Sequence, residues 1–147
     1  MSWTQWLSDK LDAAKAGWSR FNNRKFKEAT MAICARIAAA HGGVDQSEKN
    51  DVANVIAGIP ELKDFDPAVL YNLFEGYCDQ LNKGPIGKIV CDRAASQIKG
   101  DAGACAAACQ IALMIANSDG CFQPAEQTAF KEICAAMGVD PTPYLPK

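Results

Sequence analysis

Four carboxylates in two short segments could together bind a metal ion. Asp45 and Glu48 follow one glycine-containing turn, and Asp119 and Glu126 flank a second turn at Gly120. Divalent cations such as calcium and magnesium prefer oxygen ligands gathered in this way. Each segment is too short to enclose a cation alone, and neither has EF-hand spacing. The expected site therefore binds a divalent cation weakly and draws on both segments.

The same four residues could instead serve only to cap helices. Asp45 and Glu48 have the spacing of a capping box, in which each side chain accepts a hydrogen bond from the other residue's backbone N–H. Glu126 stands at the equivalent position in the second segment, and Asp119 could end a helix through a tight turn at Gly120. The sequence leaves capping and cation binding open.

Cysteines are the second set of side chains that could carry chemistry. A zinc or thiol-redox site would need a Cys-x-x-Cys pair or several ligands at zinc-finger spacing, and the sequence has neither. The single histidine, His41, has no evident partner to orient it for nucleophilic catalysis. We therefore predict a non-enzymatic protein with separate, buried thiols, no disulfide and no tetrahedral metal. The seven cysteines are Cys34, Cys78, Cys91, Cys105, Cys109, Cys121 and Cys134.

An internal repeat connects the two acidic segments. Residues 33–56 align without a gap on residues 111–134 at a constant offset of 78, so that Gly42 meets Gly120 and Glu48 meets Glu126. Each copy has the pattern of a helix, a glycine turn and a second helix. One such unit cannot bury its apolar face alone. The repeat therefore predicts a pseudo-twofold arrangement with any site located where the two turns meet.

Apolar residues recur at helical spacing along nearly the whole chain, and no segment alternates as a strand would. We predict an all-α, single-domain bundle of about seven helices, in which residues 1–22 form an N-terminal amphipathic helix and residues 23–147 form the main helical domain. The expected helices cover residues 2–21, 24–40, 45–56, 66–83, 86–99, 101–117 and 124–137.

The first expected helix carries an aromatic stripe. Trp3, Leu7, Leu11 and Trp18 follow at helical spacing and would be costly to leave in water, since burying such side chains is worth about 1.5 to 3 kcal/mol each. We expect this stripe to pack on the bundle. The alternative is a peripheral membrane or scaffold protein that docks on lipid or on a partner helix through this segment and its tryptophans.

Charge and hydropathy limit the classes of function. The net charge is -2 over 147 residues, but residues 1–40 contain seven Lys or Arg and only three Asp or Glu, which predicts one basic and one acidic side. An overall basic surface and nucleic-acid-binding motifs are absent, so nucleic acid is not an expected partner. No secretory signal and no apolar run of transmembrane length occur. We expect a cytoplasmic protein, with a peripheral position at the inner face of the membrane as the alternative.

Two motifs resemble the TerB tellurite-resistance family. They are SDGCFQPAE at residues 118–126, and NRKFKEATMAICARIAAA at residues 23–40, and the resemblance extends over residues 21–144. It implies a non-enzymatic protein of tellurite resistance or stress response that docks on protein partners of the same system, including membrane-associated ones. Where the family has Asp-Gly in the first copy, this chain has His41, Gly42 and Gly43. That departure weakens the first half of a two-acid cation site.

Overall fold

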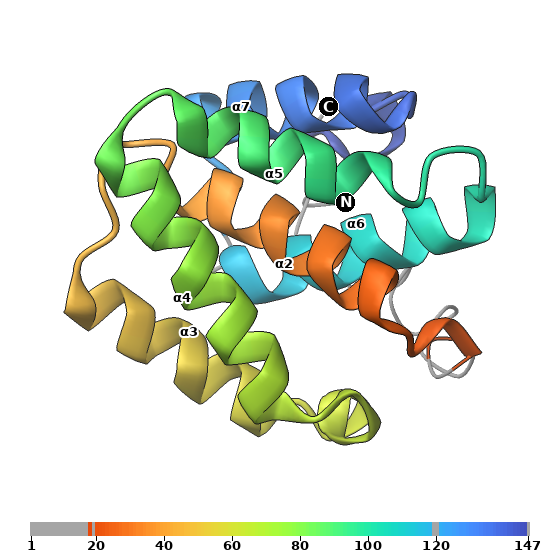
Figure 1. The fold of residues 1–147 in the computed structure, drawn as a ribbon, viewed down its shortest axis with the longest axis horizontal. Coiled ribbons are helices and arrows are strands. Elements are labelled where there is room, and N and C mark those ends of the chain that lie inside the picture. The colour runs from red at the N-terminus through yellow and green to blue at the C-terminus, as the bar shows by residue number, and fades with distance from the viewer. Residues whose placement is uncertain (1–17, 19, 119–120, 147) are drawn as a thin grey trace.

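The computed structural model describes residues 18, 20–118 and 121–146 and is all-helical over them. Six α-helices and two short 3-10 segments follow in order (Figure 1). They are α2 (Arg24–Ala38), α3 (Gln46–Gly58), η2 (Pro60–Phe65), α4 (Pro67–Lys83), α5 (Ile86–Ser96), α6 (Ala102–Ala116), α7 (Pro124–Met137) and η3 (Thr142–Tyr144). The all-α bundle predicted from the sequence is confirmed. The expected N-terminal helix lies almost wholly outside the described residues, so it stays a prediction.

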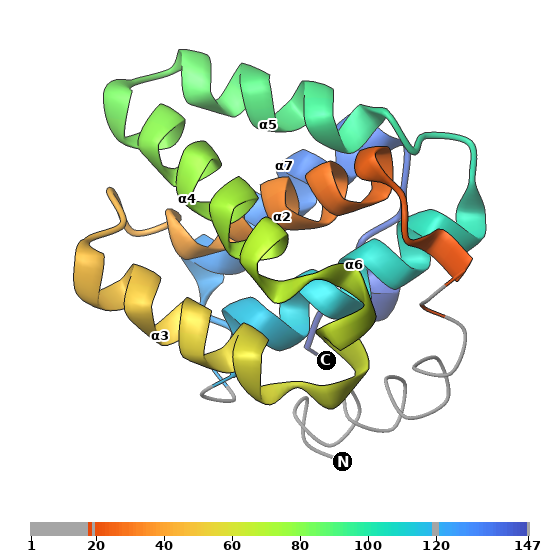
Figure 2. The ribbon, with the colours of Figure 1, turned by 60° about the horizontal axis from the view of Figure 1, so that its bottom comes forward.

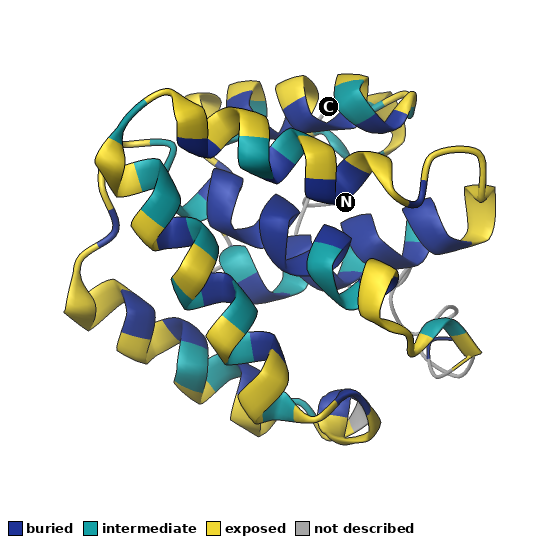
Figure 3. Cartoon of the chain, in the orientation of Figure 1, coloured by how far each residue is buried: buried dark blue, intermediate teal, exposed yellow. Residues whose placement is uncertain are grey.

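Helix α2 forms the centre of the bundle. Ten of its fifteen residues are buried, and it packs against α4, α5, α6 and α7. Figure 3 shows the middle and C-terminal part of α2 as buried, between helices with exposed outer faces, whereas its N-terminal turn is exposed. Helix α6, rich in alanine, is the second core helix, with nine of its fifteen residues buried. Small side chains on both helices allow their backbones to approach closely where ridges pack into grooves.

Side-chain caps start several helices at the predicted places. Asn23, Asp45 and Asp101 each accept a hydrogen bond from the backbone N–H three residues later, at 2.9, 2.8 and 3.0 Å. These bonds satisfy helix N–H groups that have no partner within the helix. At the other end of α7, Gly138 adopts φ 70°, a left-handed conformation that glycine accepts without steric cost.

Two helices end two or three residues earlier than predicted. Helix α2 ends at Ala38, and residues 39–41 form hydrogen-bonded turns rather than α-helix. Helix α5 ends at Ser96, because residues 97–100 tighten into turns that finish at Gly100 with φ 94°. Both differences fall at chain reversals, where short-range i to i-3 bonds replace the α-helical pattern.

The helix bounds follow the offset of the repeat. Arg24–Ala38 shifted by 78 gives the bounds of α6, and the first residue of α3 shifted by 78 gives the first residue of α7. Packing also crosses between the copies, since α2 packs on α7 and α6 packs on α3. Ile37 and Ile115 are both buried, as the alignment predicts. Superposition of the two halves by a pseudo-twofold axis stays a prediction.

Trp18 is the described residue of the aromatic stripe, and it is 1% exposed. It belongs to the main hydrophobic core, so this tryptophan is not available to lipid or to a partner helix. Trp3, Leu7 and Leu11 lie outside the described residues, and the rest of that prediction is untested. No helix among the described residues is long and apolar enough to cross a membrane.

Candidate functional site

The carboxylates at the starts of α3 and α7 act as helix caps. Asp45 Oδ1 accepts from the Glu48 N–H at 2.8 Å, and Glu126 Oε1 accepts from the Gln123 N–H at 2.7 Å within a capping box. Glu48 is exposed, and Glu126 is half-buried. The capping interpretation is therefore confirmed for Asp45 and Glu126. Capping uses only part of each carboxylate, so oxygen lone pairs remain for other ligands.

The structure leaves the predicted cation site untested. Asp119 lies outside the described residues, and among those that are described no group of three or more His, Cys, Asp or Glu could hold a metal ion. Asp45 caps α3, which packs on α4 and α6, whereas Glu126 belongs to α7, which packs on α2 and α5 (Figures 1 and 2). A site that uses both segments remains a prediction.

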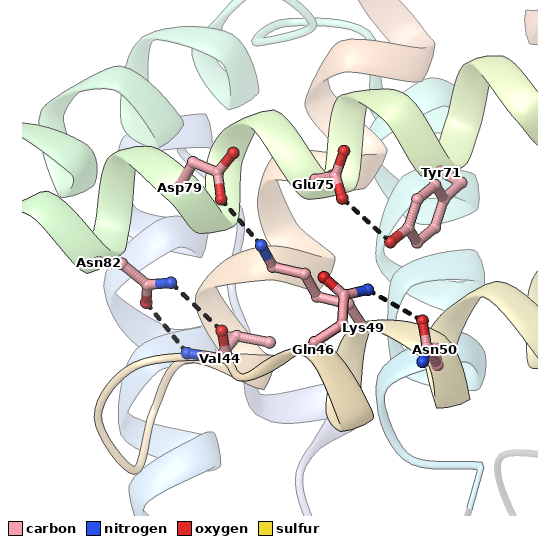
Figure 4. Close-up of polar contacts among 8 residues, drawn as sticks. All are labelled: Val44, Gln46, Lys49, Asn50, Tyr71, Glu75, Asp79 and Asn82. Carbon is pink, nitrogen blue, oxygen red and sulfur yellow. Dashed lines mark hydrogen bonds and ion pairs between the residues drawn. The ribbon is translucent and has the colours of Figure 1, made fainter.

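A side chain from α4 holds the first turn in place. The amide of Asn82 accepts from the Val44 N–H at 3.0 Å and donates to the Val44 carbonyl at 3.2 Å (Figure 4). A Cβ at Gly43 would lie 2.9 Å from Asn82 Oδ1, so this residue must be glycine for the two bonds to form undisturbed. No sequence pattern predicts the role of Asn82, because its partner is a backbone group 38 residues away.

A buried lysine ties α3 to α4. Lys49 is 8% exposed, and its Nζ donates to Asp79 Oδ1 at 2.8 Å (Figure 4). The hydrogen bond to Asp79 raises the pKa of Lys49, and burial opposes that shift. A buried ammonium is costly unless it is paired. Sequence periodicity alone could not find this pair, because a lysine beside a helix cap usually faces solvent.

A second buried charge joins three helices. Arg36 of α2 is 4% exposed, and its Nη1 donates to Asp92 of α5 at 3.2 Å, while its Nη2 donates to Glu132 of α7. Burial raises the pKa of Asp92 although the Arg36 guanidinium acts to lower it. The sequence contains a sign of this buried charge, because Arg36 is the only charged residue in the mostly apolar run from Ala29 to Ala40.

A cavity of about 720 Å³ lies where the first turn approaches α7. Its wall combines the end of α2 and the following turn, the α4–α5 connection, and the first turns of α7. The lining residues are Arg36, Ala39, Ala40, Gly42, Gly43, Leu81, Asn82, Gly84, Pro85, Lys88, Ala125, Thr128, Ala129 and Glu132. The first copy's turn and the second copy's last helix thus share one cavity. His41, exposed in the same turn, does not line it.

Six of the seven thiols lie in the hydrophobic core. None of the seven cysteines forms a disulfide, and all except Cys121 are buried. Burial raises the pKa of Cys78 and of Cys91 to about 12, so both are protonated at neutral pH. Cys109 hydrogen-bonds to Cys134, and that bond together with burial raises the pKa of Cys109. The predicted separation is only partial, because α6 and α7 bring Cys109 and Cys134 into contact.

The fold is an all-helical bundle in which acidic side chains take part in the caps of α3 and α7. The sequence profile of the family described as Tellurite resistance protein TerB matches residues 27–144. The chain belongs to the TerB family. It is also similar to the Tellurium resistance protein TerB of Alcaligenes sp, with 42% identity over 55 residues, which are 37% of this chain and 45% of that protein. The aligned region thus covers less than half of that relative. No solved structure matches the chain significantly.

Proposed function

We propose that this chain is a non-enzymatic protein of tellurite resistance that acts in the cytoplasm as an interaction module. The observation that carries the proposal is the family match over residues 27–144, which reaches from α2 to η3. The relative from Alcaligenes sp is named for tellurium resistance, which supports the same role. The raised pKa of Cys78 and of Cys91 argues against these two buried thiols as nucleophiles, since a protonated thiol is a poor nucleophile.

The test of this role is growth of the native host on tellurite. Deletion of the gene should lower the tellurite concentration that stops growth, and the intact chain supplied in trans should restore it. Expression must be matched by immunoblot, so that protein amount is not the variable. Unchanged tolerance after deletion, in a strain with no second copy, would contradict the proposal.

We further propose that Asp45, Glu48, Asp119 and Glu126 bind a divalent cation weakly. The exposure of Glu48 and the partial exposure of Glu126 support this, because their oxygens can reach a cation without unfolding the caps. Titration with calcium or magnesium should shift the backbone amides of residues 118–126 before those of residues 41–48, since the second segment keeps an acid before its glycine.

Asp119→Asn is the informative variant for this site. It keeps the shape of the side chain but removes a charged oxygen, so the cation-induced shifts should disappear with little change in thermal stability. Asp64→Asn, which alters an exposed acid in η2, is the matched control and should leave the titration unchanged. Unfolding at a lower temperature in Asp119→Asn without any cation response in the intact chain would show that these acids only cap helices.

A further inference from the structure

Two isoleucines stand exposed on the outer face of α5. Ile86 is 65% exposed and Ile89 is 49% exposed, and the remaining exposed large apolar side chain among the described residues is Val69 on α4, at 37%. Residues three apart lie on the same face of a helix. Gly87 and Cys91 bury the opposite face of α5. The two isoleucines therefore form one apolar stripe on a helix that lies at the outside of the bundle (Figures 2 and 3).

The surroundings of this stripe are basic, although the whole chain carries a net charge of -2. Lys83, Lys88 and Arg93 are all exposed, and none forms an ion pair within the part of the chain that the structure describes. Between residues 80 and 100 the one acidic residue is Asp92, and Arg36 already pairs with it. With Arg36, Lys83, Lys88 and Arg93 counted against Asp92 and Glu132, this face carries a net charge of 4 - 2 = +2 next to exposed apolar surface.

The cavity of about 720 Å³ adjoins the same face. Pro85 and Lys88, on either side of Ile86 and Gly87 in sequence, line its wall. At the cavity, the charges of Arg36 and Lys88 are balanced by those of Asp92 and Glu132. Lys88 is the exposed cation of its lining, and the excess positive charge of this face comes from Lys83 and Arg93. A side chain from another molecule that lies along α5 has room to enter here.

We propose that the outer face of α5, together with this cavity, is the docking surface for an acidic amphipathic helix of a partner protein. The apolar stripe of that helix covers Ile86 and Ile89, and its carboxylates pair with Lys88 and Arg93. Apolar anchors surrounded by complementary charges are the usual means of helix recognition. A lipid bilayer fits less well, because its flat surface does not fill the cavity beside the stripe. The inference rests on the proposed role as an interaction module and names the chemistry of the partner.

The test uses a synthetic helical peptide with leucines on one face and glutamates on both flanks. Fluorescence anisotropy should show binding to the intact chain, and a peptide with lysine in place of each glutamate should not bind. Ile86→Ser/Ile89→Ser should weaken binding by about tenfold or more, as expected for loss of central anchors. Val69→Ser removes an exposed apolar side chain elsewhere and should leave binding unchanged.

Charge reversal makes the test specific. The variant Lys88→Glu/Arg93→Glu should no longer bind the glutamate peptide and should bind the lysine peptide instead. The control Arg24→Glu/Lys25→Glu on α2 makes the same change in net charge and should not change which peptide is bound. Thermal melts must show that each variant is folded. Equal binding by the intact chain and the α5 variants, or no binding, overturns the inference.

Lipid is tested as the other occupant. The protein should not co-sediment, through contacts made by α5, with vesicles that contain equal amounts of phosphatidylglycerol and phosphatidylcholine. Sedimentation that Ile86→Ser/Ile89→Ser abolishes, without peptide binding, would assign the face to a membrane and overturn the inference. Rescue of growth on tellurite is measured separately for each variant. If a variant that does not bind the peptide still restores growth on tellurite, the docking inference is wrong and the proposed role in tellurite resistance is unaffected.

Discussion

At the scale of single residues, Arg36 shows how a buried charge depends on its partners. Its guanidinium is nearly inaccessible, whereas Asp92 and Glu132 are 42% and 53% exposed at their side chains. Glu132→Gln keeps one acceptor and should cost about 1 to 2 kcal/mol of unfolding free energy. The double change Asp92→Asn/Glu132→Gln leaves the buried cation without a counter-charge and should cost about 3 to 5 kcal/mol.

Urea unfolding measures these differences, and Glu48→Gln, which changes an exposed acid, should stay within about 0.5 kcal/mol of the intact chain. If the double variant is as stable as Glu132→Gln alone, then the Arg36 charge is not buried as the structure describes.

Gly43 and Asn82 should behave as one unit. Gly43→Ala places a Cβ against the Asn82 amide, and Asn82→Ala removes the same two hydrogen bonds to Val44 directly. Each change should cost about 1 to 2 kcal/mol. Because they disrupt the same interaction, the double variant should be about as unstable as either single variant rather than their sum. Additive losses in a thermodynamic cycle would mean that the two residues act independently.

At the scale of helices, the Lys49–Asp79 pair fastens α3 to α4. The pKa of Lys49 is raised above its ordinary value of 10.5. The pair therefore contributes its full stability from neutral pH up to about 10.5, and this contribution is lost as the pH rises through the raised pKa of Lys49. Asp79→Asn should therefore destabilise the chain at pH 7 by about 1 to 3 kcal/mol.

The difference between Asp79→Asn and the intact chain should shrink in more alkaline solution, when both are compared by urea unfolding at each pH. Lys49→Met keeps the apolar stem and removes the charge, so it serves as the control that separates packing from pairing. A difference that does not change between pH 7 and the alkaline limit would contradict the assignment of a charged pair.

At the scale of the whole molecule, burial divides the cysteines into one accessible thiol and six protected ones. Cys121 is exposed, and the other six are buried in the core. A thiol reagent added to the native chain should modify one cysteine rapidly and the remaining six only when the chain opens. Cys121→Ser should remove the fast phase, and Cys34→Ser should leave it intact. More than one fast thiol would show that the core is more open than the structure describes.

Sequence patterns alone determined the class of fold and the family. Helical spacing, caps such as Asp45 and Asp101, and glycines at helix ends are local signals, because each depends on residues within one or two turns. The repeat at offset 78 is also visible from an alignment of the sequence with itself, and the bounds of α2 and α6 follow the same offset. The acidic motif at residues 118–126 led to the TerB family, which the family match confirms.

Only the tertiary structure decided which polar residues are buried and what they contact. Lys49 and Asp79, Val44 and Asn82, and Arg36 and Glu132 are separated by 30, 38 and 96 residues, and no local pattern specifies such partners. The same holds for the exposed stripe on α5, since Ile86 and Ile89 have the spacing of core residues. Whether an apolar helix face is covered depends on which helices surround it, and that is a property of the packed chain.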